Sequence, residues 1–144
     1  MTRIDRFAGQ YASLSNFWPC PVKLDGVTYP SVEHAYQAAK TLDPVFRDMI
    51  RAAVKPAYAK RLGHAAPLRE GWDDIRLEVM RELCWQKFRD PRLWQALMTT
   101  GSAELIEGND WGDTFWGVCK GVGENHLGLI LMNIRDRISA RMVG

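Results

Sequence analysis

YPSVEHAYQAAK, residues 29–40, marks the place where the chain changes from a strand to a helix. Pro30 cannot donate a hydrogen bond to a neighbouring strand, so the strand is expected to end there. Ser31 belongs to the residue types that cap helices, because its hydroxyl can accept a hydrogen bond from a free backbone N–H of the first turn. The pattern therefore predicts a helix over residues 32–41.

One side of this predicted helix is polar and the other is apolar. At about 100° per residue, Glu33, Gln37 and Lys40 fall within about 60° of one another on the helix. The opposite side consists mainly of alanine, valine and tyrosine. The polar stripe is either a surface that faces solvent, which the helix dipole would favour for the first-turn carboxylate of Glu33, or the wall of a catalytic pocket. The helix alone does not distinguish the two.

Turn and helix signals on both sides of this stretch predict the rest of the fold. Upstream, Asp25-Gly26 lies between two strand-like runs, which is a strong hairpin signal. Downstream, prolines at helix starts, apolar residues at helical spacing, and Gly63 and Gly101 as helix ends indicate a series of helices. We expect an α+β, predominantly helical fold with a small antiparallel β element, formed as one compact domain over residues 1–144. The expected helices lie within residues 44–53, 56–65, 71–90 and 91–100, and from His126 onward.

The composition excludes several classes of protein. Of the 144 residues, 47% are apolar and six are tryptophan, which argues against disorder and fits one domain with a sizeable core. No apolar run approaches the length of a membrane span, and the N-terminus lacks the apolar region of a secretory signal, so no membrane association is expected. A net charge of +2, with acids and bases interleaved, does not indicate a nucleic-acid surface.

The cysteines and histidines form no metal-binding or disulfide pattern. Cys20, Cys84 and Cys119 are odd in number and contain no CxxC pair, so we expect small apolar fillers and a reducing, cytoplasmic location. The three histidines are far apart and lack HExxH or HxxxH spacing. Neither a metal nor another cofactor is therefore expected.

EGNDWGDTFWG, residues 107–117, is a second cluster of polar and aromatic residues, which we call the acidic turn. Its glycines permit sharp turns of the backbone. Chemistry on a nucleobase or ribosyl group needs a flat apolar surface for stacking and a carboxylate near the sugar carbon, and this segment contains both. The structural alternative is a tight turn whose tryptophans anchor it to the core.

Two further segments carry polar residues with ordinary structural uses. Asn125 precedes the helix expected from His126 and would cap it. The glycines before that helix would also suit an anion, although the run GVGENHLG is not a GxGxxG motif. In YASLSNFWPC, Asn16 and two serines are expected to satisfy turn hydrogen bonds, and Trp18 is expected in the core.

Taken together, these segments resemble the NADAR (YbiA-like) N-glycosidase family over nearly the whole chain. Each motif that carries the resemblance is short, but all five occur in the family's order. Residues 43–98 match in helical character rather than in motif. The motifs are LSNF, the S-x-E-H-x-x-Q-x-x-K helix, the L-x-E before the acidic turn, D-x-x-W-G, and the final N-x-L-G-x-x-L-M-x-x-R.

The resemblance implies a YbiA-like fold and hydrolysis of an N-glycosidic bond to a phosphate-bearing ribose. The expected substrate is a small molecule, a phosphoribosylamino-pyrimidine of early riboflavin biosynthesis. The alternative is ADP-ribose attached to guanine, with ADP-ribosylated nucleic acid as the partner. The family pattern places Glu33 and Lys40 in the pocket with Asp113 and Trp116 facing them, which makes the polar stripe a catalytic wall. It also places at the substrate Asn16, Gln37, Glu107, Trp111, Asn125 and His34, the last orienting rather than reacting.

The expected reaction expels a nitrogen from C1′ of ribose through an oxocarbenium-like transition state. Glu33 is the first choice for the general base and electrostatic stabiliser, and Asp113 is the second. Lys40 has two open roles. As a cation it would hold the phosphate or a ribose hydroxyl, and as a desolvated amine it would attack C1′ and form a Schiff base. The rival from another class is a non-catalytic module for nucleotide or ADP-ribose, although recognition alone does not require a carboxylate beside a lysine.

Overall fold

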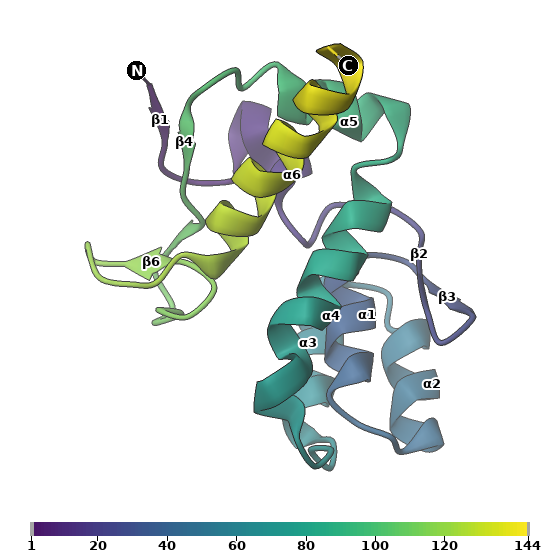
Figure 1. Ribbon diagram of the computed structural model, residues 1–144. Helices are drawn as coiled ribbons and strands as arrows, with labels where there is room; N and C mark the ends of the chain where they lie inside the picture. Colours follow the sequence, from purple (N-terminus) through teal and green to yellow (C-terminus); the bar gives the residue numbers. More distant parts are fainter. Residues whose placement is uncertain (1, 144) are drawn as a thin grey trace. The chain divides into compact units, whose positions relative to one another are not determined.

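The computed structural model describes residues 2–143, which form two compact units (Figure 1). We call Asn16–Lys87 the central unit, and the described residues up to Ser15 together with those from Phe88 onward the terminal unit. The organisation as one domain over residues 1–144 stays a prediction. The central unit contains β2 (Val22–Leu24), β3 (Val27–Tyr29), α1 (Val32–Ala39), α2 (Pro44–Ala52), α3 (Pro56–Ala65) and α4 (Trp72–Lys87). The terminal unit contains β1 (Arg3–Ile4), the 3₁₀ helix η1 (Gly9–Leu14), α5 (Pro91–Met98), β4 (Glu104–Leu105), β5 (Gly108–Asn109), β6 (Val118–Cys119) and α6 (His126–Val143).

The central unit begins with the predicted β-hairpin, which the structure confirms. Strands β2 and β3 pair antiparallel, with Val22 opposite Tyr29. Asp25 and Gly26 form the two-residue turn, with φ of 50° and 80°. Positive φ at both central positions fits a type I′ turn, whose twist matches the twist of the paired strands. The Asp-Gly pair therefore fixes the connection between the two strands.

Short polar side chains cap three of the helices. The Ser31 hydroxyl accepts a hydrogen bond from the His34 N–H at 3.1 Å, which confirms Ser31 as the N-cap of α1. Asp43 and Asp90 accept first-turn N–H groups of α2 and α5 in the same way, and a proline follows each of them. These groups would otherwise lack partners at a helix start. Helix α1 ends at Ala39, slightly earlier than predicted, with Lys40 as its C-cap.

Helix α1 is the buried helix of the central unit. All its residues, from Val32 to Ala39, are buried. Helices α2, α3 and α4 and both strands of the hairpin pack against it (Figure 1). Its alanines are small enough to let these neighbours approach closely, and Ala35, Ala38 and Ala39 have no exposed surface. The polar side chains of α1 are therefore enclosed together with its apolar ones.

Gly63 does not end α3, contrary to the prediction. The helix continues to Ala65, and Gly63 is one of its buried residues. A Cβ at position 63 would lie 2.9 Å from both Cβ and Cδ of Gln37 in α1. The glycine therefore permits a close approach of α1 and α3. Glycine is common both at helix ends and at close helix contacts. Its role at position 63 is therefore known only once the neighbouring helix α1 is in place.

The terminal unit combines short strands with two helices. Strand β1 pairs with β4 and β5 with β6, and both pairs are parallel. Only antiparallel pairing was predicted, because strands of two residues are too short to show an alternating pattern. Helix α6 buries Leu127, Ile130, Leu131 and Ile134, which confirms its predicted apolar face. The fold is predominantly helical with small β elements, as the sequence predicts.

Burial supports one expectation about single residues and overturns another. Cys20, Cys84 and Cys119 are buried and form no disulfide, as expected for apolar fillers. Burial raises the pKa of the Cys84 thiol to about 12. Trp18, which was predicted in the core, has 40% of its surface exposed, so that prediction is wrong.

Within the described part of the chain, no helix has both the length and the apolar character that a membrane span needs.

Candidate active site

The polar stripe of α1 is enclosed by protein. Glu33 has 8% of its surface exposed and Gln37 has 2%, while Lys40 at the end of the helix is half-buried. Removing a carboxylate or an amide from water is unfavourable unless polar partners compensate for the loss. The interpretation of the stripe as a surface facing solvent is therefore wrong. Its catalytic role stays a prediction.

Gln37 holds the Glu33 carboxylate. The Gln37 side-chain Nε2 donates a hydrogen bond to Glu33 Oε2 at 2.8 Å, between residues one helical turn apart. The bond holds the Glu33 carboxylate in one orientation on the buried stripe. The role of Glu33 as general base stays a prediction.

The other end of the Gln37 amide is unsatisfied. Gln37 Oε1 is buried and has no hydrogen-bond partner in the described chain. The reverse orientation of the amide would set Oε1 against the Glu33 carboxylate, oxygen against oxygen, so the bond to Glu33 determines the orientation. A buried carbonyl oxygen without a partner costs about 1–3 kcal/mol. The fold is stable despite this cost, and Gln37 Nε2 keeps its hydrogen bond to Glu33.

Asn16 supports the start of α1 with its backbone. Its carbonyl oxygen accepts the Glu33 N–H at 3.1 Å. Its side-chain Nδ2 lies 3.5 Å from the Met80 sulfur, and its Oδ1 accepts a weak hydrogen bond from the Cys84 thiol at 3.9 Å. The residue of the LSNF motif therefore positions the helix turn that carries Glu33. Direct contact between Asn16 and substrate stays a prediction.

Both ring nitrogens of His34 are committed to the protein. Nε2 donates to the Ala53 carbonyl oxygen at 2.9 Å, and Nδ1 shares a hydrogen bond of 2.7 Å with the Ser31 hydroxyl. The same hydroxyl accepts the His34 backbone N–H. His34 therefore ties the start of α1 to the end of α2, consistent with an orienting role.

Lys40 is two helical turns beyond Glu33. The spacing of seven residues corresponds to about 10.5 Å along the helix axis, so two long side chains can converge on one ligand. The Lys40 ammonium nitrogen lies 5.5 Å from the centre of the Tyr36 ring, within the range of a cation–π interaction. Tyr36 in turn packs against Trp72, with ring centres 5.3 Å apart. These aromatic rings restrict the positions open to the Lys40 side chain.

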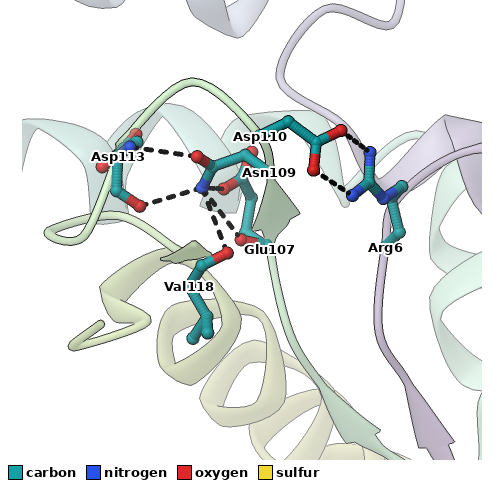
Figure 2. Close-up of polar contacts among 6 residues, drawn as sticks. All are labelled: Arg6, Glu107, Asn109, Asp110, Asp113 and Val118. Atoms are coloured by element: carbon teal, nitrogen blue, oxygen red, sulfur yellow. Dashed lines mark hydrogen bonds and ion pairs between the residues drawn. The ribbon is translucent and has the colours of Figure 1, made fainter. Parts of the chain in front are cut away.

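The acidic turn is organised by Asn109, as Figure 2 shows. Its Nδ2 donates to the Asp113 carbonyl oxygen at 2.8 Å and to Glu107 Oε2 at 3.1 Å, and its Oδ1 accepts the Asp113 N–H at 3.0 Å. Asn109 has 3% of its surface exposed. One buried amide therefore connects the two acids that the sequence had selected. Our sequence reasoning missed this residue, although an asparagine in a glycine-rich turn is a common signal of side-chain bonding to the backbone.

The Asp113 carboxylate shapes the turn that follows it. Its Oδ1 accepts the backbone N–H groups of Phe115 at 3.1 Å and Trp116 at 2.9 Å. Trp116 is half-buried, and its ring packs edge-on against Phe115 with centres 4.8 Å apart. Trp111 has 60% of its surface exposed and does not anchor the turn to a core. One Asp113 oxygen is thus a structural acceptor, and a catalytic role would use the other.

Asn125 positions Glu107 and is not a side-chain cap of α6. Its Oδ1 accepts the Glu107 N–H at 3.0 Å, and its Nδ2 donates to the Leu105 carbonyl oxygen at 2.9 Å. The capping prediction is therefore wrong for the side chain, because the Glu107 N–H takes the oxygen that a cap would use. Gly117 completes this arrangement, since a Cβ there would collide with Glu107 oxygens and lie 2.9 Å from Asn109 Nδ2.

An exposed ion pair closes the acidic turn at its outer end. Both guanidinium NH groups of Arg6 donate to Asp110, each at 3.0 Å (Figure 2). The hydrogen bonds and the charge of Arg6 lower the pKa of the Asp110 carboxyl. Because both side chains face solvent, the pair contributes little to stability. Sequence reasoning did not find this pair, since its partners are far apart in the chain.

We expect Asn109→Ala to loosen the acidic turn. It removes the hydrogen bonds that the buried amide makes to Glu107, Asp113 and Val118. Each is worth about 0.5–1.5 kcal/mol, so the melting temperature should fall by several degrees. Turnover should fall as well, because Glu107 and Asp113 lose their common support. Asp110→Asn is the matched control, one residue away and exposed, and should change neither quantity appreciably. An unchanged melting temperature in Asn109→Ala would contradict the organising role.

The structure thus gathers the candidate residues in two sets, one in each unit. Asn16, Glu33, His34, Gln37 and Lys40 belong to the central unit, and Glu107, Trp111, Asp113, Trp116 and Asn125 to the terminal unit. Within the part of the chain that is described, no three His, Cys, Asp or Glu side chains gather in a way that could hold a metal ion.

Comparisons with known proteins show which family the chain matches. The family model described as NADAR domain matches residues 5–139. The chain is 38% identical over 133 residues to N-glycosidase YbiA of Escherichia coli K12, covering 90% of this chain and 82% of that protein. It is 40% identical over 129 residues to riboflavin biosynthesis protein VVA0006 of Vibrio vulnificus, covering 87% of this chain and 35% of that protein. The NMR structure of E. coli YbiA superposes with a TM-score of 0.85 at 35% identity, covering 99% of this chain and 88% of that one.

Proposed function

Since the chain belongs to the NADAR domain family, we propose that it hydrolyses the N-glycosidic bond between a phosphate-bearing ribose and an amino-pyrimidine. The family resemblance and the YbiA-like fold predicted from the sequence are confirmed. The general activity, hydrolysis of N-glycosyl compounds with a small-molecule substrate, follows from relatives named N-glycosidase. A relative named as a riboflavin biosynthesis protein supports the amino-pyrimidine.

The observation that carries the proposal is the buried pair of Glu33 and Gln37. When the C1′–N bond breaks, its electron pair leaves with the nitrogen and positive charge develops on the ribose. A carboxylate with little water around it stabilises that charge strongly, because the effective dielectric constant is lower than in water. The hydrogen bond from Gln37 Nε2 holds the Glu33 carboxylate in position. Water then supplies a hydroxyl group to C1′ and a proton for the departing amine.

Lys40 has the two roles open to an amine at this position. Its cation would bind the phosphate of the substrate. Its neutral form would instead attack C1′ and expel the amino-pyrimidine, giving a Schiff base with ring-opened ribose that water hydrolyses. The position of Lys40 on the same helix as Glu33, beside the Tyr36 ring, supports both roles.

We propose that the acidic turn binds the base of the substrate. Trp116 offers an aromatic face for stacking on the pyrimidine. Asp113 is the second candidate for the general base, through the oxygen that accepts no backbone N–H. The support for both assignments is the family motif D-x-x-W-G, together with the hydrogen bonds that hold this motif in one conformation.

The test is parallel incubation of the protein with two substrates. With a phosphoribosylamino-pyrimidine we expect release of the free pyrimidine and ribose phosphate, measured by chromatography. With DNA that carries ADP-ribose on guanine we expect far slower release of ADP-ribose. Faster release from the DNA would show that ADP-ribosylated guanine, and not the amino-pyrimidine, is the substrate. Binding without release from either would favour a non-catalytic module.

A further inference from the structure

We propose that Gly63 is a positioning residue for the reaction, because its missing side chain leaves the space in which Gln37 holds Glu33. The inference rests on the proposed function for its effect on turnover, but its structural part does not depend on any substrate. It concerns three residues of the central unit, on the two adjacent helices α1 and α3.

The space at Gly63 is taken up by Gln37. The three atoms nearest to a Cβ built at position 63 all belong to Gln37. Its Cβ and Cδ would lie 2.9 Å away, and Oε1 would be closer still. Real side chains do not tolerate such distances, so either Gln37 or the helix would have to move. Any movement of the Gln37 amide acts directly on the 2.8 Å bond from its Nε2 to Glu33.

The backbone does not require glycine at this position. Several glycines of the chain have positive φ, among them Gly26 and Gly71, but Gly63 does not. It lies inside α3, where glycine is less favourable than alanine because it gains more freedom in the unfolded chain. The advantage of glycine at position 63 is therefore the contact with Gln37.

The unsatisfied oxygen of Gln37 points to the same conclusion. Oε1 is the atom of Gln37 nearest to the Cβ position of residue 63, and it lacks a hydrogen-bond partner in the described chain. A buried amide that served packing alone would be replaceable by an apolar side chain without this loss. The amide nitrogen, Nε2, has a partner, and that partner is Glu33. The arrangement of the three residues therefore serves the carboxylate.

The test is a cycle of three variants: Gly63→Ala, Gln37→Ala and the double variant. Gly63→Ala should lower the melting temperature by at least about 4 °C, because the methyl group overlaps Gln37. In the Gln37→Ala background the same change should raise it by about 2–4 °C, because the overlap is gone and alanine favours the helix. Two effects of the same sign in both backgrounds would overturn the proposal.

Turnover provides the second readout. Gly63→Ala should lower kcat by about ten- to a hundredfold with little change in KM, because it displaces Glu33 without touching substrate. The double variant should be no slower than Gln37→Ala alone. If the two losses multiply instead, Gly63 does not act through Gln37.

A spectroscopic readout separates this proposal from the proposed function. The side-chain NH₂ signals of Gln37 are identified in an amide NMR spectrum by their loss in Gln37→Ala. In Gly63→Ala these signals should shift and exchange faster with water. If the wild type is inactive but Gly63→Ala shifts the Gln37 signals, the proposed substrate is wrong and the positioning of Gln37 by Gly63 stands. If the wild type is active but Gly63→Ala leaves the Gln37 signals unmoved, the proposed function stands and the positioning role is wrong.

Discussion

Glu33→Gln is expected to lower turnover at least about a hundredfold while the protein stays folded. The neutral amide cannot stabilise a positive charge at C1′ or take a proton from water. It can, however, accept the same hydrogen bond from Gln37 Nε2, so the packing around α1 should persist. The effect should therefore appear in kcat and not in the melting temperature.

The matched control for this variant is Glu78→Gln. Glu78 is an exposed glutamate of α4 in the same unit, and it pairs with Arg81 one turn away. Its loss of charge should leave turnover near that of the wild type. Turnover is measured as pyrimidine release under saturating substrate. If Glu33→Gln is folded and as active as this control, Glu33 has no part in the mechanism.

Lys40→Arg is expected to lower turnover at least about a thousandfold if Lys40 is the covalent nucleophile, and to keep much of it if Lys40 only binds the phosphate. Arginine keeps the positive charge and can keep the cation–π contact with Tyr36, so anion binding should largely survive. A guanidinium is protonated throughout the working pH range and cannot form an imine. The substitution therefore separates the two roles of Lys40.

Borohydride provides the direct measurement for Lys40. Hydride adds to the carbon of the Schiff base, which leaves ribose phosphate attached to Nζ as a stable secondary amine. Intact-mass spectrometry should detect this adduct on the wild type and on Lys55→Arg, an exposed lysine at the start of α3. It should be absent from Lys40→Arg. Robust activity in Lys40→Arg together with no adduct on the wild type would make water activated by Glu33 the nucleophile.

The sequence predicted well the features that depend on near neighbours. The hairpin at Asp25-Gly26 and the cap at Ser31 are made by residues within a few positions of one another. The apolar face of α6 follows from helical spacing alone. The position of Glu33 and Lys40 on one stripe follows from helical spacing as well, while their catalytic roles stay predictions.

The sequence predicted less well the residues whose role depends on a distant partner. Gly63 reads as a helix end until α1 lies against it. Asn125 looks like a helix cap in the sequence, but in the structure its side chain binds the backbone of Glu107 and Leu105 instead. Asn109 went unnoticed because its importance lies in joining Glu107 to Asp113, which no spacing rule describes.

The sequence by itself determined the family, the predominantly helical fold and the positions of Glu33, Gln37 and Lys40 on one stripe. These follow from local backbone preferences and from motifs, which a linear chain displays directly. Only the tertiary structure decided that the stripe is buried and that Gln37 donates to Glu33. Burial depends on which helices cover α1, and that covering is produced by contacts between segments that the sequence keeps apart.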